Sequence, residues 1–221
     1  MTSGLMMGLS MDRLSIRDGT FYPQNDAIEV VIVNAARVSR AYFKDQFDSS
    51  KTVAPTCWSV DTQRSDPGVP EQQRQSNRCM DCPQNVRGSA GRGRACRFSQ
   101  RLAVAFVDDL EKIYQLQLPA TSIFGKTVRG HMPLQEYARY LAKNNTLCAS
   151  VVTKIYFDSN SPVPKLFFKP QGLLDKEQLE IVEGMIDHPD THQAITSEVI
   201  SSATSSPFDS VDGYVHKPNH S

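Results

Sequence analysis

The segment 57–96 of this 221-residue chain has almost no aliphatic side chains. Such a segment cannot build an apolar core, so something other than apolar burial must hold it in shape. The chain also lacks a run of about 18 uncharged apolar residues, which excludes a membrane-spanning helix. Its first residues include no basic segment and no signal-type cleavage site. These absences predict a cytoplasmic protein with one main domain.

Motifs of common enzyme classes are missing as well. The sequence has no phosphate-binding loop ending in Gly-Lys-Ser or Gly-Lys-Thr, no nucleophile elbow and no zinc-protease helix. No pair of carboxylates has the spacing of a nuclease site. The adjacent acids Asp108 and Asp109 are more simply explained as part of a hairpin turn than as catalytic groups. The sequence therefore favours a protein that is not an enzyme.

The formal net charge of zero conceals two regions of opposite sign. Between Arg78 and Arg101, six arginines face one acidic residue, which is a net charge of +5. Beyond Gln171, nine acidic residues face two lysines, which is a net charge of −7. A basic middle and an acidic end indicate an electrically polarised molecule.

Four of the five cysteines lie in or at the ends of the aliphatic-poor segment: Cys57, Cys79, Cys82 and Cys96. The two-residue gap of Cys79-Met-Asp-Cys82 lets both thiolates reach one tetrahedral ion from a tight turn. Four thiolates leave no open position, so the sequence predicts a structural zinc site that orders the segment. An iron–sulfur cluster on the same ligands and incidental free thiols are the alternatives. We expect Cys148, which precedes a strand, to be an ordinary buried thiol.

The loop from Gly88 to Arg101 combines glycines with arginines just before and after the last of these cysteines. Glycines allow close approach of the backbone to a ligand, and guanidinium groups bind phosphate oxygens in a fork. The simpler interpretation is a solvated basic loop. Because the loop continues into a strand, we expect four of its arginines to contact phosphates of a nucleic acid: Arg92, Arg94, Arg97 and Arg101.

Aromatic and basic residues also interleave elsewhere in the chain. This pattern suits binding of a single-stranded nucleic acid, because aromatic rings can stack on its bases and cations can neutralise its phosphates. Alternation along a strand puts some of these rings in the core: Leu166 and Phe168 must face away from Phe167. Trp58 is as suited to covering the metal site as it is to stacking on a base. The predicted contact residues are Tyr42, Trp58, Lys154, Tyr156, Lys165, Phe167 and Lys169.

Strand-like segments dominate outside the cysteine region and predict a mainly β (α+β) fold, with an OB-like antiparallel barrel as the leading architecture and a β-sandwich as the alternative. We expect one domain over residues 1–195, interrupted by the insertion 57–96, and a flexible tail over 196–221. Helix 174–186 begins with a capping box at Asp175 and Gln178. The predicted strands are 29–34, 101–107, 113–119, 151–157 and 164–169, with 14–22 as a sixth, and the other predicted helix is 133–143.

Several stretches resemble a family of small four-cysteine proteins from tailed-phage genomes: CWS, CMDCP, GSAGRGRACR, LPATS, VVTKIYFD and PKLFFKP. The resemblance runs from about Val30 to Leu179. The layout is also similar to that of phage single-stranded DNA-binding proteins, which combine a barrel, a zinc-held insertion and an acidic tail. The T-even phage protein of this type has a histidine among its metal ligands, so the similarity is one of plan and carries no residue correspondence.

The resemblance and the residues together predict a protein that binds single-stranded DNA without enzymatic activity in phage DNA replication or recombination, in the cytoplasm of the host cell. The tail segment Pro207–Asp212 resembles the acidic, aromatic tips that recruit replication or host proteins. One alternative is a protein-interaction module that docks on a host replication, transcription or nuclease protein through the zinc-held loop. The other is an enzyme with an iron–sulfur site.

Overall fold

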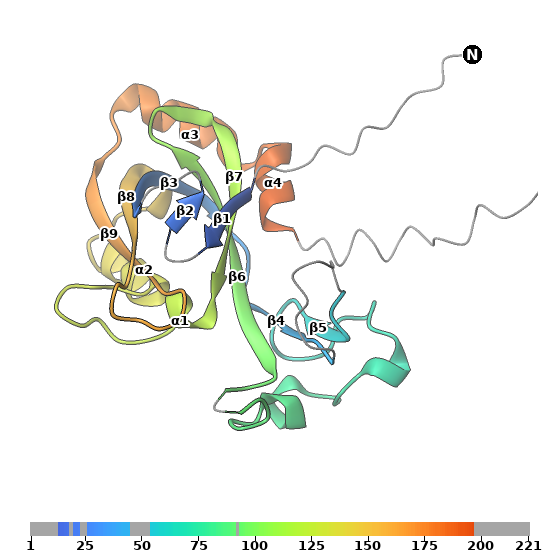
Figure 1. Cartoon of the computed structure of the whole chain (residues 1–221). Coiled ribbons are helices and arrows are strands. Elements are labelled where there is room, and N and C mark those ends of the chain that lie inside the picture. Colours follow the sequence, from blue (N-terminus) through green and yellow to red (C-terminus); the bar gives the residue numbers. More distant parts are fainter. Residues whose placement is uncertain (1–12, 18–19, 23–25, 45–53, 92, 197–221) are drawn as a thin grey trace, which may run out of the picture.

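A computed structural model describes residues 13–17, 20–22, 26–44, 54–91 and 93–196, and these form a mainly antiparallel sheet with a few short helices (Figure 1). The sheet has nine strands in the order β2–β1–β7–β6–β3–β8–β9, with β4 paired to β6 and β5 paired to β4. The mainly β class is confirmed. The strands are β1 (Arg13–Arg17), β2 (Thr20–Tyr22), β3 (Ala27–Ala35), β4 (Ser39–Tyr42), β5 (Cys57–Ser59), β6 (Cys96–Phe106), β7 (Asp109–Pro119), β8 (Val151–Phe157) and β9 (Leu166–Leu173).

Strand β3 lies inside the sheet, between β6 and β8, and it buries both of its faces. Val30 and Ile32 belong to one apolar cluster, whereas Val31 and Val33 belong to a second cluster. Because successive side chains of a strand point to opposite faces, a strand covered on both sides reads as an unbroken apolar run. This explains the sequence EVVIV, which has no polar alternation.

Helices cover the two faces of the sheet. In the first cluster, Tyr137 and Leu141 of α2 (Leu134–Lys143) pack with Phe168 and other strand residues, beside the short α1 (Ala120–Ile123). In the second cluster, Val182 and Met185 of α3 (Lys176–Ile186) pack with small and aliphatic residues of β3, β6 and β7. The helix α4 (Pro189–Ile195) adds Ala194 to the second cluster.

The two helices predicted from the sequence are present. The capping box of α3 is complete, because the Gln178 N–H donates to Asp175 Oδ1 at 2.8 Å and the Asp175 N–H donates to Gln178 Oε1 at 3.1 Å. The helix α4 was not predicted; it begins with Pro189 at its first position. Within the described residues, no helix is long and apolar enough to cross a membrane.

The sheet does not close into a barrel, because β9 forms no ladder with β7 among the described residues. The chain that follows β7 covers the edge of β9 instead. The Leu166 N–H donates to Ser122 Oγ at 2.9 Å, and the Phe168 N–H donates to the Met132 carbonyl at 2.9 Å. Pro170, the next residue but one, has no N–H to satisfy. The edge is thus protected without a closing strand.

Residues 54–95, which we call the cysteine lobe, lie apart from the two apolar clusters at the lower right of Figure 1. The lobe consists of β5, loops and three 3-10 turns: η1 (Glu71–Gln73), η2 (Cys79–Asp81) and η3 (Pro83–Asn85). Val69 is its one buried aliphatic side chain among the described residues. The lobe therefore has no apolar core of its own, as its composition predicts.

Candidate metal centre and nucleic-acid interface

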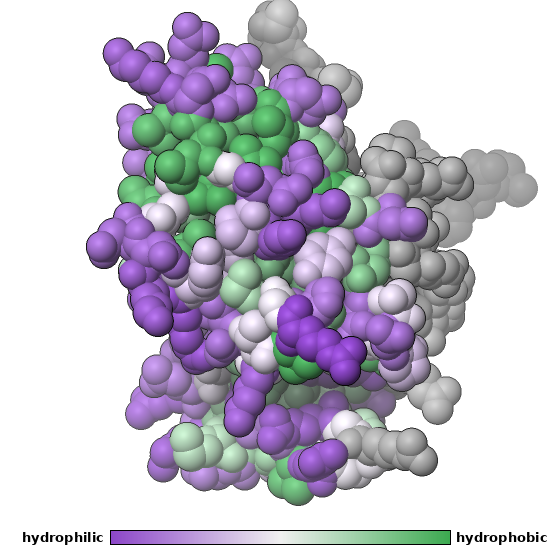
Figure 2. Space-filling view, turned by 90° about the vertical axis from the view of Figure 1, so that its left-hand side faces the viewer, coloured by the Kyte–Doolittle hydropathy of each residue, from purple (hydrophilic) through white to green (hydrophobic). Residues whose placement is uncertain are grey.

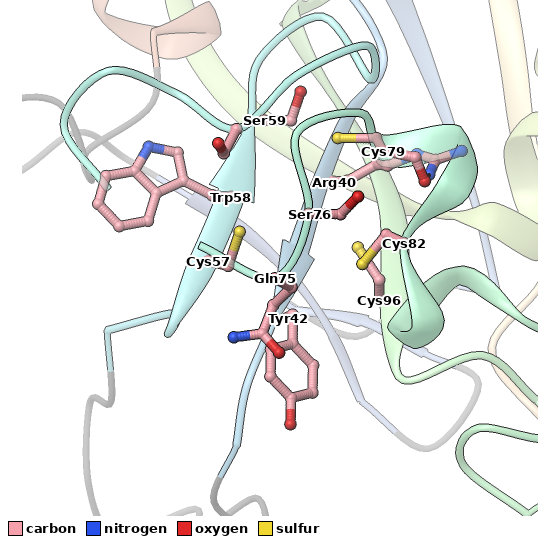
Figure 3. Close-up of a pocket in the computed structure, with 11 residues that line it drawn as sticks. Arg40, Tyr42, Cys57, Trp58, Ser59, Gln75, Ser76, Cys79, Cys82 and Cys96 are labelled. Atoms are coloured by element: carbon pink, nitrogen blue, oxygen red, sulfur yellow. Dashed lines mark hydrogen bonds between the residues drawn. The ribbon is translucent and has the colours of Figure 1, made fainter. Parts of the chain in front are cut away.

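The structure brings Cys57, Cys79, Cys82 and Cys96 to the lining of a single pocket (Figure 3). Cys57 begins β5, Cys79 begins η2, Cys82 follows η2, and Cys96 begins β6. The four residues come from three segments that are separated in the sequence by 21 and 13 residues. Their meeting is therefore a product of the folded lobe.

A three-stranded ribbon of β5, β4 and β6 positions two of the four thiols. Tyr42 of β4 pairs with Cys57 on one side and with Cys96 on the other. Directly opposite residues of an antiparallel pair project from the same face. Cys57 and Cys96 therefore stand on the same face of the ribbon, on either side of Tyr42.

The other two thiols belong to a pair of consecutive 3-10 turns. The Cys79 N–H donates to the Gln63 carbonyl at 2.8 Å, and the Asn85 N–H donates to the Cys82 carbonyl at 2.9 Å. Asn85 also donates through Nδ2 to the Cys79 carbonyl at 3.1 Å. These bonds fix the backbone on both sides of the Cys-x-x-Cys motif, so the two thiols are presented together toward the pocket.

The four thiols share the pocket without forming a tight cluster. Across the described residues, no group of three or more His, Cys, Asp or Glu side chains is placed to hold a metal ion. Zinc–sulfur bonds are about 2.3 Å long, so the side chains would have to turn inward onto an ion. The donor set nevertheless fits zinc in its chemistry, because all four thiols are free and surround the same space.

The pKa values of two of these thiols reflect their shared surroundings. Burial raises the pKa of Cys96 to about 11; nearby Arg40 opposes the shift, whereas the other three cysteines of the pocket reinforce it. Burial also raises the pKa of Cys57, which the Gln75 N–H partly offsets and which Cys79 and Cys82 increase. Without a metal these thiols are protonated at neutral pH, so a metal must displace their protons.

Arg40 is a residue of this pocket that the sequence did not reveal. Its guanidinium group lies 4.1 Å from the centre of the Phe98 ring, and its Nη1 donates to the Cys79 carbonyl at 3.1 Å. Its Nε is buried, with no hydrogen-bond partner among the described residues. In the sequence, Arg40 stands two residues before Tyr42, so in a strand both side chains project from the same face. That spacing points to the pocket only when β4 is known to pair with β6.

Trp58 lines the pocket and is half-buried. Its indole Nε1 is enclosed by the protein and has no hydrogen-bond partner in the described part of the chain. A ring enclosed in this way has less surface to offer a nucleic-acid base. Because neighbouring residues of a strand project to opposite faces, the ring of Trp58 lies on the other side of β5 from Cys57, turned away from the four cysteines (Figure 3).

The basic loop that precedes Cys96 is held by its own hydrogen bonds. Gly88 and Gly91 adopt positive φ angles of 98° and 59°, which tighten the loop. The Gly88 N–H donates to the Gly93 carbonyl at 2.8 Å, and the Ala95 N–H donates to Ser89 Oγ at 2.9 Å. These bonds order the loop locally, independently of the pocket.

The arginines predicted to contact phosphates are distributed along this loop and β6. Arg94 and Arg97 are exposed, Arg101 is partly buried, and Arg92 lies outside the described residues. Arg97 and Arg101 have the same parity along β6 as Ala103, so they share its face of the sheet. The helices α3 and α4 pack on this face farther along β6 and β7.

Four other predicted contact residues share the outer face of β8 and β9. Tyr156 lies directly opposite Phe167, and Lys154 lies directly opposite Lys169. Figure 2 shows the side of the molecule that carries these strands, where hydrophilic surface predominates below an apolar area. Lys165, directly before β9, pairs with Asp158 at 2.8 Å.

Phe167 itself is buried, so it offers no open stacking surface. The His131 ring lies 5.1 Å from the Phe167 ring, the Tyr156 ring lies 5.9 Å away, and the Lys165 ammonium group lies 4.5 Å above it. His131 Nδ1 and the Tyr156 hydroxyl are 2.8 Å apart. The exposed ring of this cluster is therefore His131, which was not among the residues predicted from the sequence, whereas Tyr156 is half-buried.

Cys148, predicted to be a buried thiol, is partly buried and lies in a turn (η4, Cys148–Ser150) that leads into β8. It is a free thiol, and burial raises its pKa to about 11.

Comparisons of the chain with protein-family models, with curated proteins and with solved structures find no match.

Proposed function

We propose that this protein binds single-stranded DNA without enzymatic activity, through a zinc-held lobe and the neighbouring sheet surface, and serves phage DNA replication or recombination. The observation that carries the proposal is the position of the cysteine lobe within the strand order. The lobe forms most of the connection between β3 and β6, which are adjacent strands inside the sheet, and β4 forms the start of that connection. That connection is where an oligonucleotide-binding fold places one of its ligand-binding loops.

The strand order supports an OB-like fold. Taken along the chain, β3, β6, β7, β8 and β9 act as the five strands, with α2 between the third and the fourth. Their order in the sheet, β7–β6–β3–β8–β9, is that of an OB barrel opened between its third and fifth strands. In such a fold, nucleic acid binds on the second and third strands and on the loops that follow the first and fourth strands. Here these loops are the cysteine lobe and the turn 158–165.

Two groups of residues would contact the DNA. Beside the cysteine lobe, Arg94, Arg97 and Arg101 would bind phosphates, together with Arg92. On the outer face of β8 and β9, the opposed lysines Lys154 and Lys169 repel each other, and this unfavourable contact would be relieved by a phosphate between them. Glu29 flanks Lys154 on the other side, where Gln171 Nε2 donates to its carboxylate.

The metal in this proposal is zinc held by Cys57, Cys79, Cys82 and Cys96, with an iron–sulfur cluster on the same residues as the alternative. Bound zinc would supply a fixed tetrahedral cross-link and no reactive position. The chain's own residues would position the four ligands: the β5–β4–β6 ribbon places Cys57 and Cys96, and the consecutive 3-10 turns place Cys79 and Cys82. The lobe would then hold its arginines in a fixed direction relative to β6.

The test is the affinity for a thymidine oligonucleotide measured by fluorescence anisotropy at increasing salt. We expect affinity to fall steeply with salt, and the double variant Arg94→Ala/Arg97→Ala to reduce the slope by about 0.7 for each lost phosphate contact. Lys176→Ala is the matched control, because Lys176 is an exposed cation on α3 with Glu180 beside it. Absence of binding, or binding that salt does not weaken, would refute the proposal.

A second function, docking on a host protein through the cysteine lobe, is favoured by two exposed apolar side chains. Met80 and Val86 are 74% and 60% exposed in the turns that carry Cys79 and Cys82. Exposed apolar groups on a rigid turn suit a protein interface better than a phosphate backbone. The variant Met80→Ser/Val86→Ser would abolish capture of the host protein and leave DNA affinity unchanged.

The tail segment Pro207–Asp212 lies outside the described residues.

A further inference from the structure

Arg40 lies where the cysteine lobe meets the sheet, and its guanidinium group is fixed on two sides. One flat face covers the Phe98 ring at 4.1 Å, and Phe98 in turn meets the Phe124 ring edge-on at 5.2 Å. The Nη1 of Arg40 donates to the Cys79 carbonyl at 3.1 Å, inside the Cys-x-x-Cys turn. A side chain held in this way reaches the thiol pocket from the sheet side (Figure 3).

One donor of Arg40, its Nε, is both buried and without a partner among the described residues. A buried donor without a partner costs about 1–3 kcal/mol, and native proteins rarely contain one. The groups lining the same pocket that could accept this N–H and carry a negative charge are the four thiols. As neutral thiols they are weak acceptors, whereas a metal-bound thiolate is a good one.

We propose that Arg40 is the charge-balancing partner of the four-cysteine metal centre, donating its Nε–H to a metal-bound thiolate. This inference rests on the metal centre proposed above. Four thiolates and one divalent zinc ion carry a net charge of −2, which a partly buried site must offset. The guanidinium supplies one positive charge at every physiological pH, because it does not lose its proton. Arg40 is thus a positioning residue and not a ligand.

Arginine suits this position for a geometric reason. A planar guanidinium can stack on a ring while it donates hydrogen bonds in its own plane in several directions. Arg40 stacks on Phe98 and donates to Cys79, and its Nε–H is left for the pocket. Lysine would retain the charge but could not stack and donate in the same fixed geometry.

The experiment compares the wild type with Arg40→Gln, Arg40→Lys and Arg78→Gln, each purified as the full chain. Arg78 is the matched control, because it precedes Cys79 directly but its side chain is 63% exposed and lies 3.6 Å from Asp81. Zinc affinity is measured by competition with a chromophoric chelator, and cobalt(II) is titrated as a spectroscopic probe of thiolate ligation. We expect Arg40→Gln to lower zinc affinity by about 10- to 100-fold, as loss of an outer partner of metal ligands does.

A second readout separates positioning from mere structural support. Loss of the Nε–H makes the bound thiolate richer in electrons, so the thiolate-to-cobalt charge-transfer band of Arg40→Gln should shift to lower energy at full loading. Alkylation of the zinc-loaded protein by iodoacetamide should also become faster. Arg40→Lys should show a smaller loss of affinity with the same direction of band shift, and Arg78→Gln should match the wild type in every measurement.

The outcomes are distinct. A wild-type protein that binds neither zinc nor cobalt refutes the metal centre, and the role of Arg40 with it. A wild type that binds both, together with Arg40 variants of unchanged affinity and band position, refutes the role of Arg40 alone. If Arg40→Gln does not fold, Arg40→Lys decides the question, because an unshifted band and unchanged affinity in that variant would contradict the proposal.

Discussion

The sheet and the cysteine lobe are stabilised in opposite ways. The sheet buries two apolar clusters, one on each face, and its helices complete both of them. Among its described residues the lobe buries one aliphatic side chain, Val69, and it is otherwise held by turns, hydrogen bonds and the pairing of β5 with β4. Loss of a single apolar contact should therefore weaken the sheet gradually, whereas the lobe should depend on a metal ion held by its three thiols together with Cys96.

The largest expected effect concerns the proposed metal centre. Structural zinc sites contribute about 10–16 kcal/mol of apparent binding free energy, so chelation or Cys82→Ser should release the order of the lobe. We expect amide hydrogens of residues 57–87 to exchange quickly in the chelated protein, while those of β3 and β8 remain protected. Cys148→Ser is the control, since Cys148 lies apart from the pocket. Equal protection of the lobe with and without metal would contradict this picture.

The next effect is on the sheet. Phe168 is fully buried in the first cluster, and its ring stacks against Tyr137 with centroids 6.0 Å apart. Phe168→Ala should lower the free energy of unfolding by about 3–5 kcal/mol, measured by urea denaturation. Leu173→Ala on the same strand should change it by no more than about 0.5 kcal/mol, because Leu173 is 72% exposed. Zinc affinity should be the same in Leu173→Ala and the wild type.

A smaller effect concerns a polar contact. Tyr137 buries its hydroxyl against Thr153 Oγ1 at a distance of 2.6 Å. Tyr137→Phe would leave the Thr153 hydroxyl without this partner, which should cost about 1–3 kcal/mol in the free energy of unfolding. Tyr140→Phe on the exposed side of the same helix is the matched control. An unchanged urea midpoint for Tyr137→Phe would show that the hydroxyl pair contributes nothing to the first cluster.

The smallest effect is a pH dependence. Lys165 donates a hydrogen bond to Asp158 and lowers the pKa of that carboxyl, with a further lowering by the Asn160 N–H. A carboxyl whose pKa is lower in the folded state stabilises the protein above its unfolded pKa, and the stabilisation is lost as the pH falls through the folded pKa. Urea midpoints should therefore decrease at acidic pH by less in Asp158→Asn than in the wild type. Identical pH profiles of the urea midpoint in the two proteins would show that the Lys165–Asp158 pair does not contribute to stability.

Much of the sheet could be predicted from local pattern. The runs 29–34 and 151–157 lie within β3 and β8, and the hairpin around Asp108 joins β6 and β7. The helix α3 was predictable because Asp175 and Gln178 have the spacing of a capping box. The helix α4 has only seven residues and too short a pattern to stand out.

The candidate site was predictable in its residue types and not in its geometry. Local pattern identified Cys79 and Cys82 as a unit, but it could not show that Tyr42 lies between Cys57 and Cys96, because that depends on pairing across three strands. Alternation placed Phe167 on the outer face correctly. It could not show that His131, from a loop after β7, covers that ring.

The sequence alone determined which parts of the chain could build apolar clusters and which could not, because burial depends on composition and on the period of side chains along a strand or helix. The tertiary structure decided how the parts meet. It brought four cysteines to one pocket and placed the guanidinium of Arg40 beside them. It also covered the edge of β9 with Ser122 and Met132 in place of a closing strand. Such contacts join residues distant in sequence, and no local pattern encodes the distance between them.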